Sequence, residues 1–510
     1  MSPTIAAADN FRDTRRVGEE PSGEGQGGGI DDEGVERDYL ASRTLQKSAG
    51  ALLLWGLGVG YVISGDFFGW NYGLNAGGFG GMVIATITMA TLYVTMIFSI
   101  AEMATMMPVA GGPYAFARRA MGPWGGYVTG LAVTIEYVVA PAVIATGIGG
   151  YVAGMFAEPP AWIEAGVPIL AYVVFVAINA MGSKTSLSLL LVITAVSVVV
   201  VIVWALSMVP HVDTSRWLDI APDPGRSRWL PHGFGGVIAA LPAAGWFYLA
   251  IEGVPLAAEE TRDPSKALPK GMIAAMLSLV ALSSLALLLA PAAAGSEALA
   301  SSANPLPAAV EAVMGRGGVY WLTTVVGLTG LIASFFSIIF AYSRQIFALS
   351  RAGYLPRWLS KTNRRGAPHW ALIVPAVVGY ACIQLVDLCN AGAVATGDLL
   401  MRIAVFAALI SYVMMMVSHF VLRRRHPGLA RPYRTPGYPL TPAIALVLSL
   451  LALSSSLFYG EAALGSVLAT LAVFAVGLLY FGLYSRHHLV ASAPEEEAAL
   501  IMEAERELDA

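Results

Sequence analysis

The chain has 510 residues, of which 56% are hydrophobic and only 13% are charged, and its formal net charge is −4. Soluble domains carry about 25% charged residues, so this composition excludes an ordinary soluble enzyme. The small net charge also argues against a nucleic-acid partner.

The first part of the chain, residues 1–47, is polar and rich in glycine and acidic residues, as in "EEPSGEGQGGGIDDEG". This composition predicts a disordered tail. No basic stretch followed by a short apolar core and a cleavage site opens the chain, so we expect the first spanning helix to act as its own insertion signal. A second acidic tail is expected over residues 487–510.

Residues 48–486 are predicted to form a transporter domain that crosses the membrane twelve times. The apolar residues fall in blocks long enough to cross a bilayer, which takes about 20 residues per helix. The predicted spans run roughly 50–75, 79–104, 123–153, 166–182, 186–209, 234–258, 271–294, 319–347, 370–389, 398–421, 440–459 and 463–484. Two halves of five spans, about 50–209 and 234–421, are followed by two extra helices at about 440–484.

Basic residues in the loops predict the orientation of these spans. Loops after even-numbered spans contain Arg118, Arg119, Lys184, Arg262, Lys266, Lys270, Arg351, Arg357, Lys361, Arg364, Arg365, Arg423, Arg424, Arg425, Arg431 and Arg434. Loops after odd-numbered spans contain only Arg216, Arg226, Arg228 and Arg316. Since basic loops stay in the cytoplasm, both termini are expected on the cytoplasmic side.

The first and sixth spans contain residues that interrupt helices. The first reads "VISGDFFGWNYG" and the sixth reads "AALPAAGWFYLAIEGVPLAAEE". Glycine and proline weaken a helix, and interrupted helices at matching positions of two halves indicate an inverted-repeat transporter with its binding site at the breaks. We expect the breaks at Gly65 and Gly253, each beside a carboxylate. For Gly56, Gly58 and Gly60 we prefer the alternative, that small residues allow close helix packing.

Three acidic residues lie deep in spans: Asp66 in the first, Glu136 in the third and Glu252 in the sixth. Each buried charge costs roughly 2.5–3.5 kcal/mol on insertion scales, and no lysine or arginine is expected at comparable depth, since Arg344 and Arg402 are placed near span ends. A buried carboxylate without a basic partner either holds a proton or binds a cation. The three acids therefore predict a site for a positively charged solute. The alternative is protonated side chains bonded inside the bundle.

Longer motifs resemble a known family. "EMATMMPVAGGPYAFARRAMGPWGGYVTG" and "AAEETRDPSKALPKG" resemble the second-span and sixth-span exits of the amino acid–polyamine–organocation superfamily, and the resemblance covers nearly all of residues 45–485. Within it, "VISGDFFGWNYG", "IEYVVAPAVIA" and "FYLAIEGVPLAAEE" look most like the ethanolamine permease branch. The resemblance implies an all-α integral membrane fold: a five-plus-five inverted repeat, leucine-transporter-like, with discontinuous helices 1 and 6, two appended helices and the substrate at the breaks.

The sequence departs from the amino-acid carriers of that superfamily at the first break. Those carriers typically have Gly-Ser-Gly followed by an apolar residue, where bare N–H groups receive the substrate carboxylate. Here Ser64 and Gly65 match, but Ile63 replaces the first glycine and Asp66 replaces the apolar residue. An ionised Asp66 would repel a carboxylate. Ethanolamine has an ammonium and a hydroxyl group only.

These arguments predict a set of substrate-binding residues, in which Phe247 and Tyr248 would add cation–π contacts. The set is Ser64, Gly65, Asp66, Glu136, Phe247, Tyr248, Glu252 and Gly253. Several relatives have a lysine midway along the fifth span, near Ser197 here, and this chain has none. Ser334 and Ser337 are weak candidates for a sodium site. Coupling to protons, coupling to sodium and exchange all stay open, and no further cofactor or metal is expected.

We therefore expect a secondary active transporter of the cytoplasmic membrane that imports ethanolamine or a similar small amine by alternating access. A carrier or exchanger of amino acids or polyamines is the nearest alternative, and an amine-binding sensor or channel is another. An enzyme is disfavoured because the chain has no HExxH or GxSxG motif and no histidine cluster in its spans, and a nucleotide-driven pump is disfavoured because it has no GxxxxGK[ST] loop.

Overall fold

The computed structural model describes residues 49–109, 111–156, 158–160, 162–390, 396–456 and 461–490. The predicted N-terminal tail and almost all of the predicted C-terminal tail lie outside these ranges. Within them the regular structure is helical apart from one isolated bridge between Ala49 and Thr261. The prediction of an all-helical chain is confirmed for this part of the sequence.

Most of the helices are long. Their bounds are α2 (Ala51–Val62), α3 (Ser64–Phe67), α4 (Tyr72–Met106), α5 (Gly112–Ala153), α6 (Trp162–Asn179), α7 (Ser183–Met208), α8 (Gly233–Trp246), α9 (Pro264–Ala294), α10 (Ser296–Ala300), α11 (Pro305–Met314), α12 (Gly318–Trp321), α13 (Leu328–Arg351), α14 (His369–Asn390), α15 (Thr396–Arg425), α16 (Leu440–Ser455) and α17 (Glu461–Leu483). Short 3₁₀ helices are η1 (Val209–His211), η2 (Thr214–Leu218), η3 (Ile251–Ala257), η5 (Arg357–Ser360) and η6 (Ser485–His487), and η4 (Leu322–Val326) is a π-helical turn.

Nine helical segments of the described chain are long and apolar enough to cross a membrane. Three other predicted spans correspond to shorter apolar helices, Ala51–Phe67, Ala165–Asn179 and Leu440–Ser455. The structure therefore supports a multi-pass membrane protein. The count of twelve and the inverted relation between the two halves stay predictions.

Glycines mark two of the helix boundaries that hydropathy predicted. α4 is bent at Gly78, where φ is 65°, and α5 is bent at Gly122, where φ is 77°. Only glycine adopts this left-handed region without strain. Each bend separates a short leading segment from the apolar helix that follows it.

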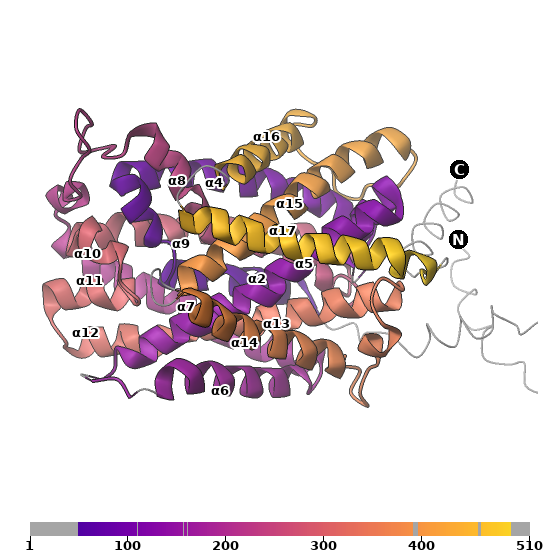
Figure 1. Ribbon diagram of the computed structural model, residues 1–510, viewed down its shortest axis with the longest axis horizontal. Helices are drawn as coiled ribbons and strands as arrows, with labels where there is room; N and C mark the ends of the chain where they lie inside the picture. The colour runs from indigo at the N-terminus through magenta and orange to yellow at the C-terminus, as the bar shows by residue number, and fades with distance from the viewer. Residues whose placement is uncertain are drawn as a thin grey trace, which may run out of the picture. The chain divides into compact units, whose positions relative to one another are not determined.

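α5 lies inside the bundle and packs along both α15 and α13 (Figure 1). α4 packs against α8 and α9, and α2 packs between α9 and α7. By contrast, α6, α7, α14 and α17 expose large apolar side chains such as Val173, Leu206, Val377 and Val476. Helices that are apolar on their outer faces too are those that contact lipid.

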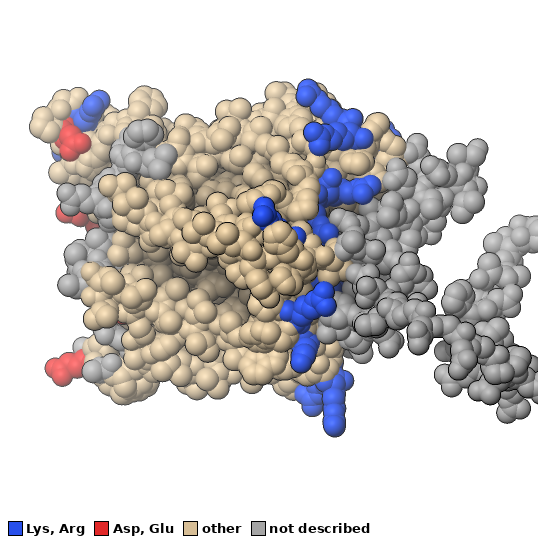
Figure 2. Space-filling model, turned by 45° about the vertical axis from the view of Figure 1, so that its right-hand side comes forward, with Lys and Arg blue, Asp and Glu red and all other residues tan. Residues whose placement is uncertain are grey.

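Charged side chains are separated on the face seen in Figure 2. Most lysine and arginine side chains in view gather toward one end, the few acidic side chains lie at the opposite end next to a smaller basic group, and a broad, mostly uncharged surface lies between the two ends. This distribution fits a protein whose middle lies in a bilayer.

Candidate functional site

The first interruption follows α3. The helix stops at Phe67, Gly69 takes a left-handed φ of 95°, and α4 begins at Tyr72. The break was expected at Gly65, but Gly65 is helical. Its role is close contact: a Cβ at this position would lie 2.6 Å from the Trp246 carbonyl oxygen. The glycine therefore lets the two interrupted segments touch backbone to backbone.

The second interruption follows α8. The helix ends at Trp246, the chain turns, and the 3₁₀ helix η3 begins after Ala250, which has a left-handed φ of 77°. The break was expected at Gly253, which instead lies inside η3. A Cβ there would lie 2.6 Å from the Tyr137 hydroxyl. The strained residue is an alanine, and residue type alone does not signal this position.

Side chains bond the backbone groups that the first interruption leaves without helical partners. Such bonding is the condition for non-helical backbone at membrane depth. The Tyr151 hydroxyl donates to the Phe67 carbonyl (2.9 Å), the Trp246 indole to the Phe68 carbonyl (2.9 Å), the Ser64 amide to Ser334 Oγ (2.8 Å) and the Gly69 amide to Asn71 Oδ1 (3.2 Å). Specific side chains therefore stabilise the non-helical backbone of the first interruption.

Asp66 lies on α3 and is fully buried. Neither of its carboxyl oxygens meets a hydrogen-bond donor among the described residues, and it forms no ion pair with a lysine or arginine there. It acts electrostatically on Tyr248, whose hydroxyl bonds Ser283 at 2.8 Å. Phe247 stacks on Trp70 with ring centroids 5.6 Å apart. Asp66 is thus a buried acid close to aromatic side chains, with no hydrogen-bond partner for its carboxyl oxygens among the described residues.

Glu252 and Glu136 form a second acidic pair, also fully buried. Glu252 accepts hydrogen bonds from the hydroxyls of Tyr137 (2.8 Å) and Tyr412 (3.0 Å), and Tyr93 donates to Tyr412 (3.2 Å). The Glu136 carboxyl group lies close enough to Glu252 for the two acids to interact electrostatically, and no hydrogen-bond donor among the described residues reaches its oxygens. Two buried carboxyl groups this close do not both ionise readily, because like charges repel strongly in a low-dielectric site.

The eight predicted substrate-binding residues are all buried and fall into two groups. Ser64, Gly65, Asp66, Phe247 and Tyr248 meet where the interruptions touch, and Glu136, Glu252 and Gly253 meet around Tyr137. The Tyr93 ring contacts both Tyr248 (5.5 Å between centroids) and Tyr412 (5.4 Å), so it stands between the groups.

The two serines suggested for sodium already have partners. Ser334 Oγ accepts from the Ser64 amide, and Ser337 donates to the Ala333 carbonyl of its own helix at 2.7 Å. In the described residues no group of three or more His, Cys, Asp or Glu side chains is placed to hold a metal ion.

The sequence reasoning missed several residues around these acids. Tyr93, Tyr137 and Tyr412 lie in apolar stretches with no motif to single them out, and none of them is in the predicted set. Arg344, expected near a span end, is fully buried and pairs with Glu260 at 3.0 Å, a partner that the sequence did not indicate. Because that glutamate occupies Arg344, this arginine does not neutralise the three acids.

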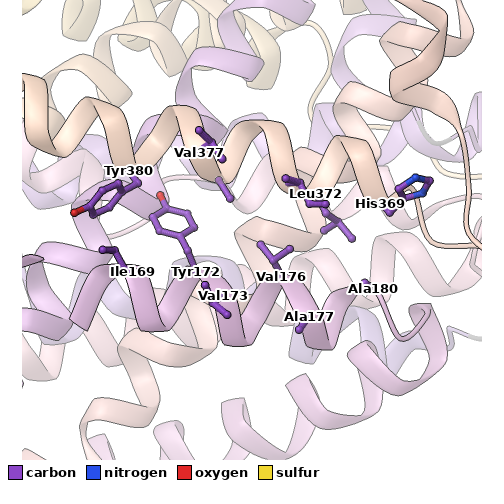
Figure 3. Close-up of a pocket in the computed structure, with 12 residues that line it drawn as sticks. Ile169, Tyr172, Val173, Val176, Ala177, Ala180, His369, Leu372, Val377 and Tyr380 are labelled. Atoms are coloured by element: carbon purple, nitrogen blue, oxygen red, sulfur yellow. The ribbon is translucent and has the colours of Figure 1, made fainter. Parts of the chain in front are cut away.

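A groove of about 480 Å³ lies elsewhere, between α6 and α14 (Figure 3). Its walls include Tyr172, Val176, Leu372 and Tyr380, and none of the eight predicted residues lines it. It is treated separately below.

Comparison with known proteins covers nearly the whole described domain. The model of the amino acid permease family matches residues 52–496. An uncharacterised transporter of Rhizobium meliloti is 29% identical over 79% of this chain and 85% of its own length. Two Bacillus subtilis proteins are each 25% identical over 88% of this chain: the branched-chain amino acid permease BcaP, over 94% of its length, and the methylthioribose transporter, over 95% of its length.

Proposed function

Because the chain belongs to the amino acid permease family, and is a membrane transporter on that ground, we propose that it imports ethanolamine or a closely related small amine. In this proposal it is a secondary transporter of the cytoplasmic membrane with both termini inside, and it works by alternating access. One observation carries the proposal: three fully buried acids beside two interrupted helices have no basic partner among the described residues.

The charge and bonding at the first interruption favour an amine over an amino acid. Asp66 would attract an ammonium and repel a carboxylate, since a charge in a low-dielectric site acts strongly on its neighbours. The Ser64 amide, a group that could receive a carboxylate, already donates to Ser334. Phe247 and Trp70 supply aromatic faces for a cation.

The Glu136–Glu252 pair supports proton coupling in the same proposal. Two adjacent carboxyl groups in a dry site do not both ionise readily, so the pair is suited to take up and release one proton as the site changes its exposure. The bonds already made by Ser334 and Ser337 leave sodium with less support.

An amino-acid substrate is the second candidate, supported by the relative named for branched-chain amino acids. Another relative of equal identity is named for methylthioribose, so similarity at this level does not select the substrate class. For an amino acid to bind, Asp66 would have to be protonated or turned away.

Uptake of labelled ethanolamine into proteoliposomes, with alanine and putrescine as competitors, tests the proposal. We expect ethanolamine to be taken up faster with an inward proton gradient, and neither alanine nor putrescine to compete with it. Inhibition by alanine together with alanine counterflow would establish the second candidate. A channel would give flux without trans-stimulation, and a sensor would bind amine without flux.

The Glu136→Gln variant tests the coupling group. We expect it to keep ethanolamine counterflow, in which the carrier returns loaded, and to lose stimulation by the proton gradient. Stimulation by the proton gradient equal to that of the wild type would contradict the assignment to this pair.

A further inference from the structure

The groove between α6 and α14 faces outward from the bundle, where a membrane protein meets lipid. Ile169 and Val173 on one wall and Ile373 and Val377 on the other are exposed between 42% and 63%. Both walls also pack against α13, with Phe335 of α13 edge-on to Tyr172. The groove is therefore a recess in the lipid-facing surface, separate from the interrupted helices.

The length of the groove matches one leaflet of a bilayer. The lining runs from Ile169 to Ala180 on α6 and from His369 to Tyr380 on α14, and Figure 3 shows His369 near Ala180 at one end and Tyr380 beside Ile169 at the other. Each wall covers eleven residue steps, or about 16 Å at 1.5 Å per residue. Half of the roughly 30 Å hydrocarbon core is about 15 Å.

The width of the groove discriminates between two kinds of occupant. Spread over its length, the 480 Å³ open to the centres of water molecules gives a cross-section of about 30 Å², and with about 1.4 Å added on each side for the water radius the groove is about 9 Å across. A transmembrane helix from a second copy or a partner is about 10–12 Å wide with its side chains, which is wider than the groove. A single extended hydrocarbon chain fits, and a helix does not.

The end of the groove at His369 carries the marks of a membrane surface. Trp358 and Trp370 are each more than 40% exposed and pack edge to face at 5.5 Å, as tryptophans do at headgroup level. The loop before α14 carries exposed Arg364 and Arg365.

This basic loop is fixed to α6. The Asn363 side-chain amide donates to the Ala180 carbonyl at 2.8 Å, and the Arg365 backbone lies against Gly182. The two arginines are thus held where the groove meets the headgroups. Each basic residue at this level raises the affinity for anionic lipid by about fivefold.

We propose that this groove is a binding site for one acyl chain of an anionic phospholipid, with its phosphate held by Arg364 and Arg365 and His369 beneath it. The lipid belongs to the leaflet on the side of the basic loops. It covers the recess between α6 and α14 and fastens both helices to α13.

The test uses the purified full-length protein, depleted of lipid and titrated with phosphatidylglycerol or phosphatidylcholine of identical chains under native mass spectrometry. We expect the wild type to prefer phosphatidylglycerol by more than about tenfold, as two arginines predict. Arg364→Gln with Arg365→Gln should abolish this preference, while Arg424→Gln with Arg425→Gln, two exposed arginines at the end of α15, should keep it. Equal binding of the two lipids by the wild type would overturn the proposal.

Substitutions that fill the groove test whether the acyl chain of the lipid binds there. Ala177→Trp on α6 and Val377→Trp on α14 should each weaken phosphatidylglycerol binding by about tenfold, equivalent to losing the burial of two methylene groups. The matched controls Leu170→Trp and Val378→Trp change exposed residues of the same helices outside the lining and should bind like the wild type. Unchanged binding by both filled variants, or a dimer that these variants dissociate, would show that the groove does not hold a lipid chain.

Discussion

Two regions of this molecule bury acidic side chains to the same degree and treat them in opposite ways. Glu102, near the end of α4, is 1% exposed and contacts Arg423 (2.6 Å), Arg431 (3.2 Å) and His419 (3.4 Å). Asp66 is fully buried and meets no donor among the described residues. A buried carboxylate with several cationic partners is satisfied by the protein itself. One without such partners is satisfied only by a proton or a ligand.

The largest expected effect belongs to the satisfied acid. Glu102→Gln would leave Arg423 and Arg431 partly buried without their counter-charge and would weaken the bond to the Thr435 amide, now 2.7 Å. We expect a loss of about 3 kcal/mol in the free energy of unfolding, measured as a lower thermal unfolding midpoint in detergent. If Asp66→Asn lowers the unfolding midpoint equally, the proposed difference between the two acids is wrong, since Asp66 has no such partners to lose.

Asp66→Asn should change transport and leave folding intact. Removing the counter-ion of an ammonium costs about 2 kcal/mol, or about thirtyfold in kcat/KM for ethanolamine. The measurement is initial uptake normalised to folded protein. Asp387→Asn, an exposed acid near the end of α14, serves as the control and should transport like the wild type. Unchanged kcat/KM for Asp66→Asn across pH 5–8 would remove Asp66 from the substrate site.

Gly65→Ala sharpens the comparison at the backbone. The added methyl group would lie 2.6 Å from the Trp246 carbonyl oxygen and 3.0 Å from the Phe247 Cα, and backbone atoms yield little. We expect a loss of about 1–2 kcal/mol of unfolding free energy. Gly149→Ala is the control, because nothing lies within 4 Å of its Cβ position and alanine favours a helix by about 0.5–1 kcal/mol. Equal midpoints for the two variants would mean that the interruptions are not in tight contact.

The smallest effect is expected at a solvated acid. The Ser265 hydroxyl donates to Asp263 at 2.7 Å and, with the charge of Lys266, holds the pKa of the Asp263 carboxyl below its ordinary value. Its side chain is 53% exposed, and water screens such pairs. Asp263→Asn should leave both the unfolding midpoint at pH 7 and ethanolamine uptake unchanged. A loss comparable to that of Glu102→Gln would show that burial does not separate the two kinds of acid.

Much of the fold follows from short-range rules that the sequence displays. Blocks of apolar residues predicted the membrane helices, and the bends at Gly78 and Gly122 fall where span boundaries were expected. Glycine beside a carboxylate in an apolar run indicated both interrupted segments. The turns themselves lie a few residues away, at Gly69 and Ala250.

The surroundings of the acids could not be predicted, because they depend on tertiary contacts. Tyr93 and Tyr412 are separated by 319 residues and meet through their hydroxyls, and a tyrosine in an apolar helix is ordinary packing in most proteins. Arg344 illustrates the same point. It is buried as an ion pair with Glu260, which lies on another segment of the chain. The substrate, the coupling ion and the orientation stay predictions.

The bond between the Trp246 indole and the Phe68 carbonyl joins residues 178 positions apart, and this has a consequence for biogenesis. At a synthesis rate of about 5–20 residues per second, the first interrupted helix leaves the ribosome about 10–40 s before its partner. Over that interval the Asp66 carboxyl group and the Phe68 carbonyl group lack hydrogen-bond partners, and exposing such groups to lipid costs free energy. We therefore expect the first half to keep these groups near water or protein until the second half is made and Trp246 can bond the Phe68 carbonyl.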